Sequence, residues 1–322
     1  MASAEHGQTS AAPLPPEDLI FRVSLADVGV FERVGRRSSE EINDALGPDW
    51  SWDGKRMLDF GCGVGRLLRY LAEEARVAEI EGCDMHEESI AWCKGNLDPP
   101  FKFFVNSADP PLAGVDDETY DLVVAISVFT HLASSWSDWM SELQRITKPG
   151  GILIATFHGR GMTEAYEVQS GTPFNEEEVG MISLPTGEVG TFASTFHSQW
   201  WLETHWGRAF EPISISPDGF CAEPGAGQGL FVGSRRVERV TAEELELADP
   251  GDPREALALQ RSDRINFEFA QQFREQALDA QLSLAKRFAL SDAGARRMLM
   301  RSFVGGNRLR RIGSRFREKG ER

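Results

Sequence analysis

Between residues 56 and 157, short runs of apolar and β-branched residues alternate with segments of helical apolar periodicity. A chain that alternates strands and helices in this way forms a parallel sheet that helices cover on both faces. The uninterrupted apolar runs Leu122–Ile126 and Ile152–Ala155 predict central strands. The predicted strands are Arg56–Phe60, Ala78–Asp84, Phe101–Val105, Tyr120–Ser127 and Gly151–Phe157, and the predicted helices are Arg66–Ala75, Glu87–Asn96 and Trp136–Thr147. The pattern indicates the α/β class.

The 322-residue chain divides into three parts. Residues 1–18, rich in Ala, Ser, Gly and Pro, predict a flexible leader. Residues 19–236 are expected to form the main domain, and residues 237–322 a helical extension with a basic tail. Outside the alternating region, the main domain is predicted to contain two helices between Ile20 and Leu46, a helix Trp200–Arg208, and strands Glu211–Ile215 and Gly229–Gly233.

The C-terminal extension carries an apolar stripe that recurs every three to five residues and predicts an amphipathic helix from about Arg254 to Leu290. Residues 286–322 hold 12 basic and 3 acidic residues. Because large apolar side chains are unstable in water, this helix is expected to pack on a partner surface. Self-association is the preferred prediction, and the main domain or another enzyme are the alternatives. The stripe consists of Ile265, Phe269, Phe273, Leu278, Leu282, Ala285 and Phe288.

Charge and cysteine content exclude several classes of function. The formal charge of −16 lies in the front part, because residues 1–236 hold 17 basic and 36 acidic residues. Such a surface is a poor binder of nucleic acid. The four cysteines form no Cys-x-x-Cys pair, so neither a disulfide framework nor a metal site is predicted. We find no apolar run long enough for a membrane span and no secretory signal, so the expected location is cytoplasmic.

The strongest local signal is Met57–Arg66, in which Asp59 ends a strand and Gly61, Gly63 and Gly65 lead into a helix. Glycines allow the backbone to turn sharply and to approach a ligand closely. A dinucleotide-binding loop would need a glycine where this chain has Arg66, and a phosphate-binding P-loop would need Gly-Lys-Ser or Gly-Lys-Thr. The loop therefore argues against NAD and against a P-loop.

A second carboxylate, Asp84, follows the next strand 23 residues after Gly61. An acidic residue about 20 residues beyond the glycine loop accepts hydrogen bonds from ribose hydroxyls. The alternative is an ordinary helix N-cap, and the two roles are compatible. The two features together predict a nucleoside-containing ligand.

Asp-x-Gly-x-Gly-x-Gly at residues 59–65 resembles the first motif of class I S-adenosylmethionine-dependent methyltransferases. Asp121–Val124, Ser127–Leu132 and Lys148–Gly151 look similar to the fourth-strand and fifth-strand signature of the small-molecule branch of that family. The motifs together cover residues 57–157. The resemblance implies a Rossmann-like, seven-stranded, mostly parallel sheet whose last strand is antiparallel, with S-adenosylmethionine as the cofactor.

The resemblance also implies the contacts to the cofactor. In the family the glycine loop lies along the methionine part, and residues after the third strand line the adenine. The residues expected to bind the cofactor are therefore Asp59, Gly61, Cys62, Gly63, Gly65, Asp84, Met85, Asn106, Ser107, Ala108 and Ser127.

Phe192–Phe210 and Gln228 look similar to methyltransferases found beside glycan-building enzymes. The similarity favours O-methylation of a sugar, glycan precursor or natural product by direct displacement. Two alternatives stay open: a methyltransferase of protein or nucleic acid, and a non-catalytic cofactor-binding scaffold subunit. The chain has no Asn-Pro-Pro-Tyr motif and its glycine loop is intact, so a small-molecule or glycan acceptor is the leading prediction.

Methylation of a hydroxyl needs a base for its proton, and histidine suits this task. His131 follows the fourth predicted strand, His158 follows the fifth, and His197 lies in a segment expected to cover the cleft. We rank His131 and His197 first as catalytic candidates, followed by His158; the alternative for each is a hydrogen-bonded structural histidine. Four tryptophans are candidates for the wall of an acceptor pocket, and ordinary packing is the alternative. They are Trp50, Trp52, Trp200 and Trp201.

Overall fold

A computed structural model describes residues 12–24, 27–170, 174–175, 177, 179–186, 192–223 and 226–261. The chain groups into two compact units, Met1–Asp263 and Arg264–Arg322. All described residues belong to the first unit. The first 11 residues of the predicted leader, most of the predicted amphipathic helix and the basic tail therefore lie outside the described residues, and self-association through that helix stays a prediction.

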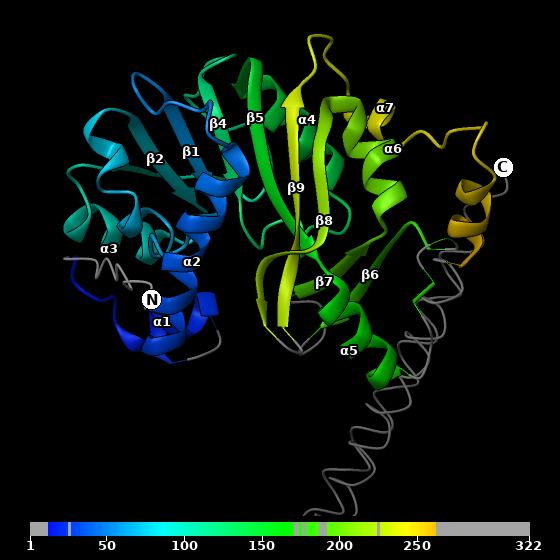
Figure 1. The fold of residues 1–322 in the computed structure, drawn as a ribbon, viewed down its shortest axis with the longest axis horizontal. Coiled ribbons are helices and arrows are strands. Elements are labelled where there is room, and N and C mark those ends of the chain that lie inside the picture. The colour runs from blue at the N-terminus through cyan, green and yellow to red at the C-terminus, as the bar shows by residue number, and fades with distance from the viewer. Residues whose placement is uncertain are drawn as a thin grey trace, which may run out of the picture. The chain divides into compact units, whose positions relative to one another are not determined.

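The first unit is built on one seven-stranded sheet with the strand order β3-β2-β1-β4-β5-β9-β8 (Figure 1). Neighbouring strands from β3 to β5 are parallel, whereas β9 is antiparallel to both β5 and β8. The predicted seven-stranded, mostly parallel sheet is thus confirmed, including the antiparallel last strand. The strands are β1 Arg56–Phe60, β2 Glu79–Asp84, β3 Lys102–Val105, β4 Tyr120–Ala125, β5 Thr147–His158, β8 Phe210–Glu223 and β9 Ala226–Arg235.

Both faces of the sheet are buried, as the continuous apolar run of β4 predicts. Val123 and Ala125 pack in one core with helices α4 (Trp136–Ile146) and α6 (Gln199–Ala209). The alternate residues Leu122 and Val124 pack in a second core with helices α2 (Val28–Leu46) and α3 (Glu87–Asn96). Side chains of a strand point alternately to opposite faces, so β4 needs apolar residues at each position from Leu122 to Ala125.

The segment after the glycine loop differs from the sequence prediction. We expected one helix over Arg66–Ala75, but the structure has two short 3₁₀ helices, η1 (Leu68–Tyr70) and η2 (Glu74–Arg76). Leu71 donates to the carbonyl of Leu68, three residues back, where an α-helix would bond four residues back. The amides of Arg69 and Ala75 do pair four residues back, so the segment mixes the two spacings and forms short turns in place of one continuous α-helix.

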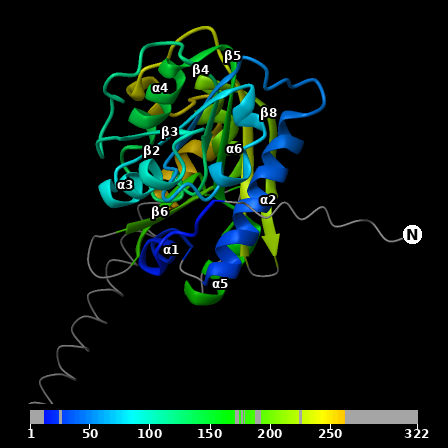
Figure 2. The same cartoon turned by 90° about the vertical axis from the view of Figure 1, so that its left-hand side faces the viewer.

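Three elements lie between β5 and α6, where the sequence analysis predicted neither helix nor strand. They are helix α5 (Arg160–Ser170) and the hairpin strands β6 (Met181–Thr186) and β7 (Phe192–His197). Together with α1 (Glu17–Ser24), they lie beyond the edge of the sheet at which the parallel strands end, the lower edge in Figures 1 and 2. The amide of Thr195 in β7 donates to the carbonyl of Thr130 at 2.8 Å, so the hairpin covers the loop that follows β4.

Core packing continues beyond Arg236, where the sequence analysis placed the end of the main domain. Helix α7 (Ala242–Glu246) buries Leu245 completely, and Ala258 is also buried in the core that contains α4 and α6. Residues 253–261 are helical, within the predicted amphipathic helix. In the described part of the chain, no helix is both long enough and apolar enough to cross a membrane.

Candidate functional site

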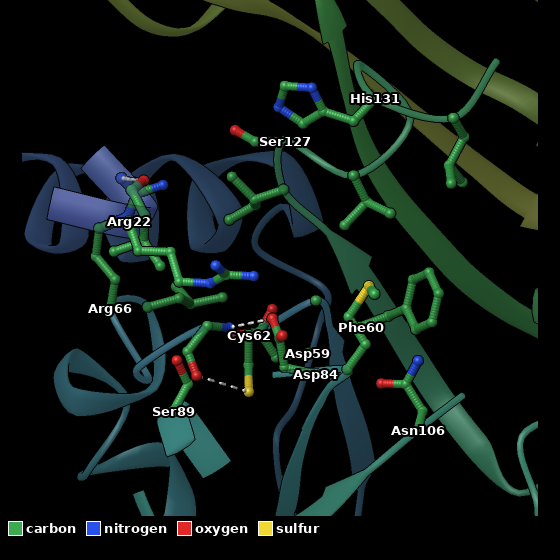
Figure 3. A pocket seen from close by; sticks show the side chains of 18 of the residues that line it. Arg22, Asp59, Phe60, Cys62, Arg66, Asp84, Ser89, Asn106, Ser127 and His131 are labelled. Carbon is green, nitrogen blue, oxygen red and sulfur yellow. Dashed lines mark hydrogen bonds between the residues drawn. The ribbon is translucent and has the colours of Figure 1, made fainter. Parts of the chain in front are cut away.

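A cavity of about 320 Å³ opens at the carboxyl ends of β1, β2 and β4 (Figure 3). Because parallel strands end at one edge, residues distant in the sequence meet there. Of the residues that the sequence analysis singled out, those that line the cavity are Asp59, Gly61, Cys62, Gly63, Asp84, Met85, Asn106, Ser107, Ala108, Ser127 and His131. Gly65, His158 and His197 are not among the lining residues.

The glycine loop adopts a backbone that side chains would disturb. Gly61 and Gly63 have φ angles of 78° and 55°, in the left-handed region that favours glycine. A Cβ atom on Gly61 would lie 2.5 Å from Cγ2 of Val128, and one on Gly63 would lie 2.6 Å from Cγ1 of Val23. Gly65 faces away from the cavity, toward Leu97. The loop therefore brings bare backbone to the cavity at two of its three glycines.

Asp84 ties the glycine loop to the end of β2. Its Oδ2 accepts a hydrogen bond from the amide of Gly63 at 2.9 Å, and its Oδ1 accepts one from the amide of His86 at 2.8 Å. The N-cap of α3 is His86, whose Nδ1 accepts from the amide of Ser89. The alternative of Asp84 as a simple N-cap is thus wrong, because His86 occupies that position.

Charged groups are buried beside the loop. Asp59 is 3% exposed, and burial raises the pKa of its carboxyl to about 7, with a further rise from Asp84 and an opposing effect of Arg66. Burial lowers the pKa of the Arg66 guanidinium, which donates to the carbonyl of Val23 at 3.2 Å. The cavity therefore holds two carboxylates, Asp59 and Asp84, whose charge a cationic ligand would stabilise.

The thiols near the loop are poor nucleophiles. Burial raises the pKa of Cys62 and Cys83 well above the ordinary range, and burial raises the pKa of Cys93 to about 12. A thiol reacts as its thiolate, so these side chains are neutral packing groups at physiological pH. No group of three or more His, Cys, Asp or Glu side chains that could hold a metal ion occurs among the described residues.

Ser127 lies at the end of β4 in a conformation that is unusual for a residue other than glycine. Its φ is 58°, and its amide donates to Oγ1 of Thr156 at 2.7 Å. Its hydroxyl lies 2.9 Å from Nε2 and 3.2 Å from Oε1 of Gln228, which comes from β9. In Figure 3, Ser127 and His131 lie at one end of the cavity and Asn106 lies at the other.

The other two candidate histidines are buried and do not line the cavity. His158 is 6% exposed and packs on Phe196 with ring centroids 4.7 Å apart. His197 is 3% exposed and packs on Trp201 and Trp206. Neither imidazole has a hydrogen-bond partner within the part of the chain that the structure describes. Burial lowers the pKa of His158 to about 4 and that of His197 to about 3, so both imidazoles are neutral at pH 7.

The four tryptophans considered for an acceptor pocket pack elsewhere. Trp50 and Trp52 precede β1 at the opposite edge of the sheet, where their rings contact each other. Trp200 and Trp201 are each 6% exposed and belong to the core that contains α4 and α6. None of the four lines the cavity.

Several lining residues have no signal in the sequence. Arg22 and Val23 come from α1, and Trp139 comes from α4. They reach the cavity only through tertiary packing, so no motif marks them. Arg66 also lines the cavity, and its position directly after the glycine loop could have identified it.

The family described as "Methyltransferase domain" matches residues 58–155. A phthiotriol/phenolphthiotriol dimycocerosates methyltransferase 1 from Mycobacterium ulcerans is 30% identical over 103 residues, which cover 32% of this chain and 37% of that protein. A fatty-acid O-methyltransferase from Mycolicibacterium smegmatis is 30% identical over 106 residues, with the same shares of the two chains. The chain thus spans well under half the length of these relatives.

Among solved structures, magnesium protoporphyrin IX methyltransferase from Synechocystis PCC 6803 aligns with a TM-score of 0.48 and 19% identity. The alignment covers 67% of this chain and 93% of that one.

The buried histidines predict a loss of stability in mild acid. A histidine in an unfolded chain has a pKa of about 6.5, above the values of both His158 and His197 in the folded protein. The unfolded state therefore binds more protons, and stability falls as the pH drops from about 6.5 toward 4, by up to about 1.4 kcal/mol per pH unit for each histidine. The free energy of unfolding of wild type and of His197→Phe can be measured by chemical unfolding at several pH values in this range. Its slope against pH should be shallower in the variant by up to about 1.4 kcal/mol per pH unit.

Phe196→Leu is the matched control, because it loses packing next to His158 without removing a titrating group. It should lower the free energy of unfolding by a similar amount at every pH. Parallel slopes for wild type and His197→Phe would contradict the burial of a neutral imidazole at residue 197.

Proposed function

We infer that this chain, whose residues 58–155 match a methyltransferase domain, is a class I S-adenosylmethionine-dependent enzyme that transfers a methyl group to an oxygen atom of a small molecule. The observation that supports this proposal most directly is the cavity in which the glycine loop, Asp84 and His131 meet at one edge of the sheet. Family membership alone would leave the reacting groups unassigned.

The residues of the cavity fit the cofactor. Gly61 and Gly63 offer bare backbone to its methionine part, and Asp84 offers carboxylate oxygens to the ribose hydroxyls. Asn106, Ser107 and Ala108 follow β3 and would line the adenine. Met85 is 58% exposed, and burial of this large apolar side chain against a ligand would be favourable. The carboxylates of Asp59 and Asp84 favour a cation.

When bound, S-adenosylmethionine supplies a methyl group on a positively charged sulfur, and the electron pair of the broken S–C bond stays on that sulfur as the O–C bond forms. The chain aligns the two reactants and excludes water from them. His131 lines the cavity beside Ser127 (Figure 3), and we assign it the role of accepting the proton of the attacking hydroxyl. His158 and His197 have a structural role in this proposal, because both are buried and neither lines the cavity.

The acceptor is proposed as a sugar, a glycan precursor or another natural product. The relative that is named a fatty-acid O-methyltransferase adds lipids to the natural products to be tested. A protein or nucleic-acid acceptor is less well supported, because residues 1–236 carry 36 acidic against 17 basic residues. A scaffold without catalysis would not need a histidine at the cavity. The cytoplasmic location stays a prediction.

Asp84→Asn should weaken the binding of S-adenosylmethionine. The substitution removes the charge that strengthens hydrogen bonds to ribose hydroxyls, which is worth about 1.5 to 3 kcal/mol, or roughly 10- to 150-fold in Kd. Isothermal titration with S-adenosylmethionine and S-adenosylhomocysteine measures the effect, and NAD serves as a ligand that should not bind. Because a ligand of the folded state stabilises it, the thermal shift should fall in parallel.

Asp121→Asn is the matched control. Asp121 also accepts from a backbone amide, that of Arg56 at 3.0 Å, and it pairs with Lys148 away from the cavity. This variant should bind the cofactor as wild type does. Equal affinities for wild type and Asp84→Asn would overturn the assignment of Asp84.

His131→Asn should lower turnover by about 100-fold or more and leave the affinity for S-adenosylmethionine unchanged, because a general base contributes about that much. Turnover is measured as S-adenosylhomocysteine release with hexadecanoate, hexadecan-1-ol and monosaccharides as acceptors. His197→Phe, which alters a buried ring that does not line the cavity, should retain turnover at a temperature where it is folded. If His197→Phe loses turnover and His131→Asn does not, the two roles are reversed.

A further inference from the structure

Ser127 and Gln228 form a side-chain pair at the end of the cavity where His131 lies. We propose that Gln228 is a positioning residue that fixes the Ser127 hydroxyl as a hydrogen-bond acceptor facing the attacking atom, so that the pocket selects a hydroxyl over a carboxylate as the group to be methylated. The inference rests on the proposed function and deepens it. Gln228, which does not line the cavity, thereby gains a role in the site, and the group to be methylated is specified as a hydroxyl.

The two hydrogen bonds between these side chains leave the serine hydroxyl able to accept, but not to donate, a further hydrogen bond. Nε2 of Gln228 donates to Oγ of Ser127 at 2.9 Å, and Oγ donates to Oε1 of Gln228 at 3.2 Å. A hydroxyl has one proton and two lone pairs. With its proton and one lone pair engaged by the amide, Ser127 keeps one lone pair, and it can only accept a further hydrogen bond.

The backbone on both sides of the pair is held in place. Ser127 keeps a φ of 58°, and Oγ1 of Thr156 in β5 accepts a hydrogen bond from its amide. Gln228 lies opposite His158 in the antiparallel pairing of β5 with β9. The next residue, Gly229, contacts the ring of Phe157 so closely that a Cβ atom would lie 2.2 Å from Cζ. The strand that carries Gln228 therefore has little freedom to move away from Ser127.

A lone pair of Ser127 at this position favours a methyl acceptor whose reacting group has a proton to donate in a hydrogen bond. A hydroxyl group can donate to Oγ of Ser127 while one of its lone pairs stays available for attack. A carboxylate has no proton and would direct its negative charge at the serine lone pair. On transfer, the O–C bond forms and the pair of the S–C bond stays on sulfur. The hydroxyl proton leaves its hydrogen bond with Oγ of Ser127 and passes to the imidazole of His131, which lies at the same end of the cavity (Figure 3).

Sinefungin provides a test that needs no methyl acceptor, because a carbon atom replaces the sulfur of S-adenosylmethionine and an ammonium group on that carbon replaces the methyl group, which S-adenosylhomocysteine lacks. An ammonium group is a donor, so it should bind to the lone pair of Ser127. Isothermal titration of the full chain with sinefungin and S-adenosylhomocysteine should show a preference for sinefungin in wild type. That preference should fall by about tenfold in Ser127→Ala, as for the loss of one charge-assisted hydrogen bond.

Gln228→Met has nearly the same shape as the glutamine but forms no hydrogen bond. If Gln228 acts through Ser127, the preference for sinefungin should fall in Gln228→Met, and adding this change to Ser127→Ala should have no further effect. The matched control is Gln199→Met, which removes an exposed amide that pairs with Glu203 and should leave the preference unchanged. Affinity for S-adenosylhomocysteine should stay within about twofold in Gln228→Met and Gln199→Met, neither of which changes a residue that lines the cavity, and this separates positioning from damage to the fold.

The outcomes distinguish this inference from the proposed function. Failure of wild type to bind either ligand overturns the proposed function. Tight binding of both ligands with the same ratio in every variant overturns the inference and leaves the proposed function standing. A second measurement compares hexadecan-1-ol with hexadecanoate in the turnover assay, where faster methylation of the carboxylate would also overturn the inferred acceptor class. If neither is methylated, the titrations decide.

Discussion

The carboxylate of Asp84 holds the site together. One of its oxygens accepts from the amide of Gly63 and the other from the amide of His86, so a single side chain joins the glycine loop to the segment that leads into α3. Gly61 and Gly63 adopt their left-handed backbone without a side-chain clash, and the tie to Asp84 helps to hold the loop in this one of the many conformations open to glycine. The same carboxylate is therefore both part of the loop's support and a proposed ligand of the ribose, and its two roles share one set of oxygen atoms.

The antiparallel strand β9 gives the other half of the site its geometry. β9 lies between β5 and β8, so a residue from near the end of the domain, Gln228, comes to lie behind Ser127 at the end of β4. The positive φ of Ser127 is energetically costly, so this conformation persists only because neighbouring groups hold it. Thr156 of β5 and Gln228 of β9 are those neighbours, and they make these two strands part of the proposed acceptor site.

The histidines divide according to burial. His131 follows β4 on a loop at the cavity, whereas His158 and His197 lie among Phe196, Trp201 and Trp206. A neutral imidazole in such surroundings behaves as an aromatic ring, and its protonation opposes folding. The aromatic segment 192–210 therefore supports the site by covering the loop after β4, and contributes packing where the sequence suggested a base.

The sequence by itself determined the sheet and the cofactor edge, because both depend on local patterns. Continuous apolar runs fix a strand that is buried on both faces, and the spacing of Asp59, Gly61, Gly63 and Asp84 places them at the ends of adjacent parallel strands. Only the tertiary structure decided which histidine reaches the cavity, that Arg22 and Trp139 line it, and that Gln228 backs Ser127. Those facts depend on long-range packing between α1, α4, β5 and β9, and no spacing within one segment carries that information.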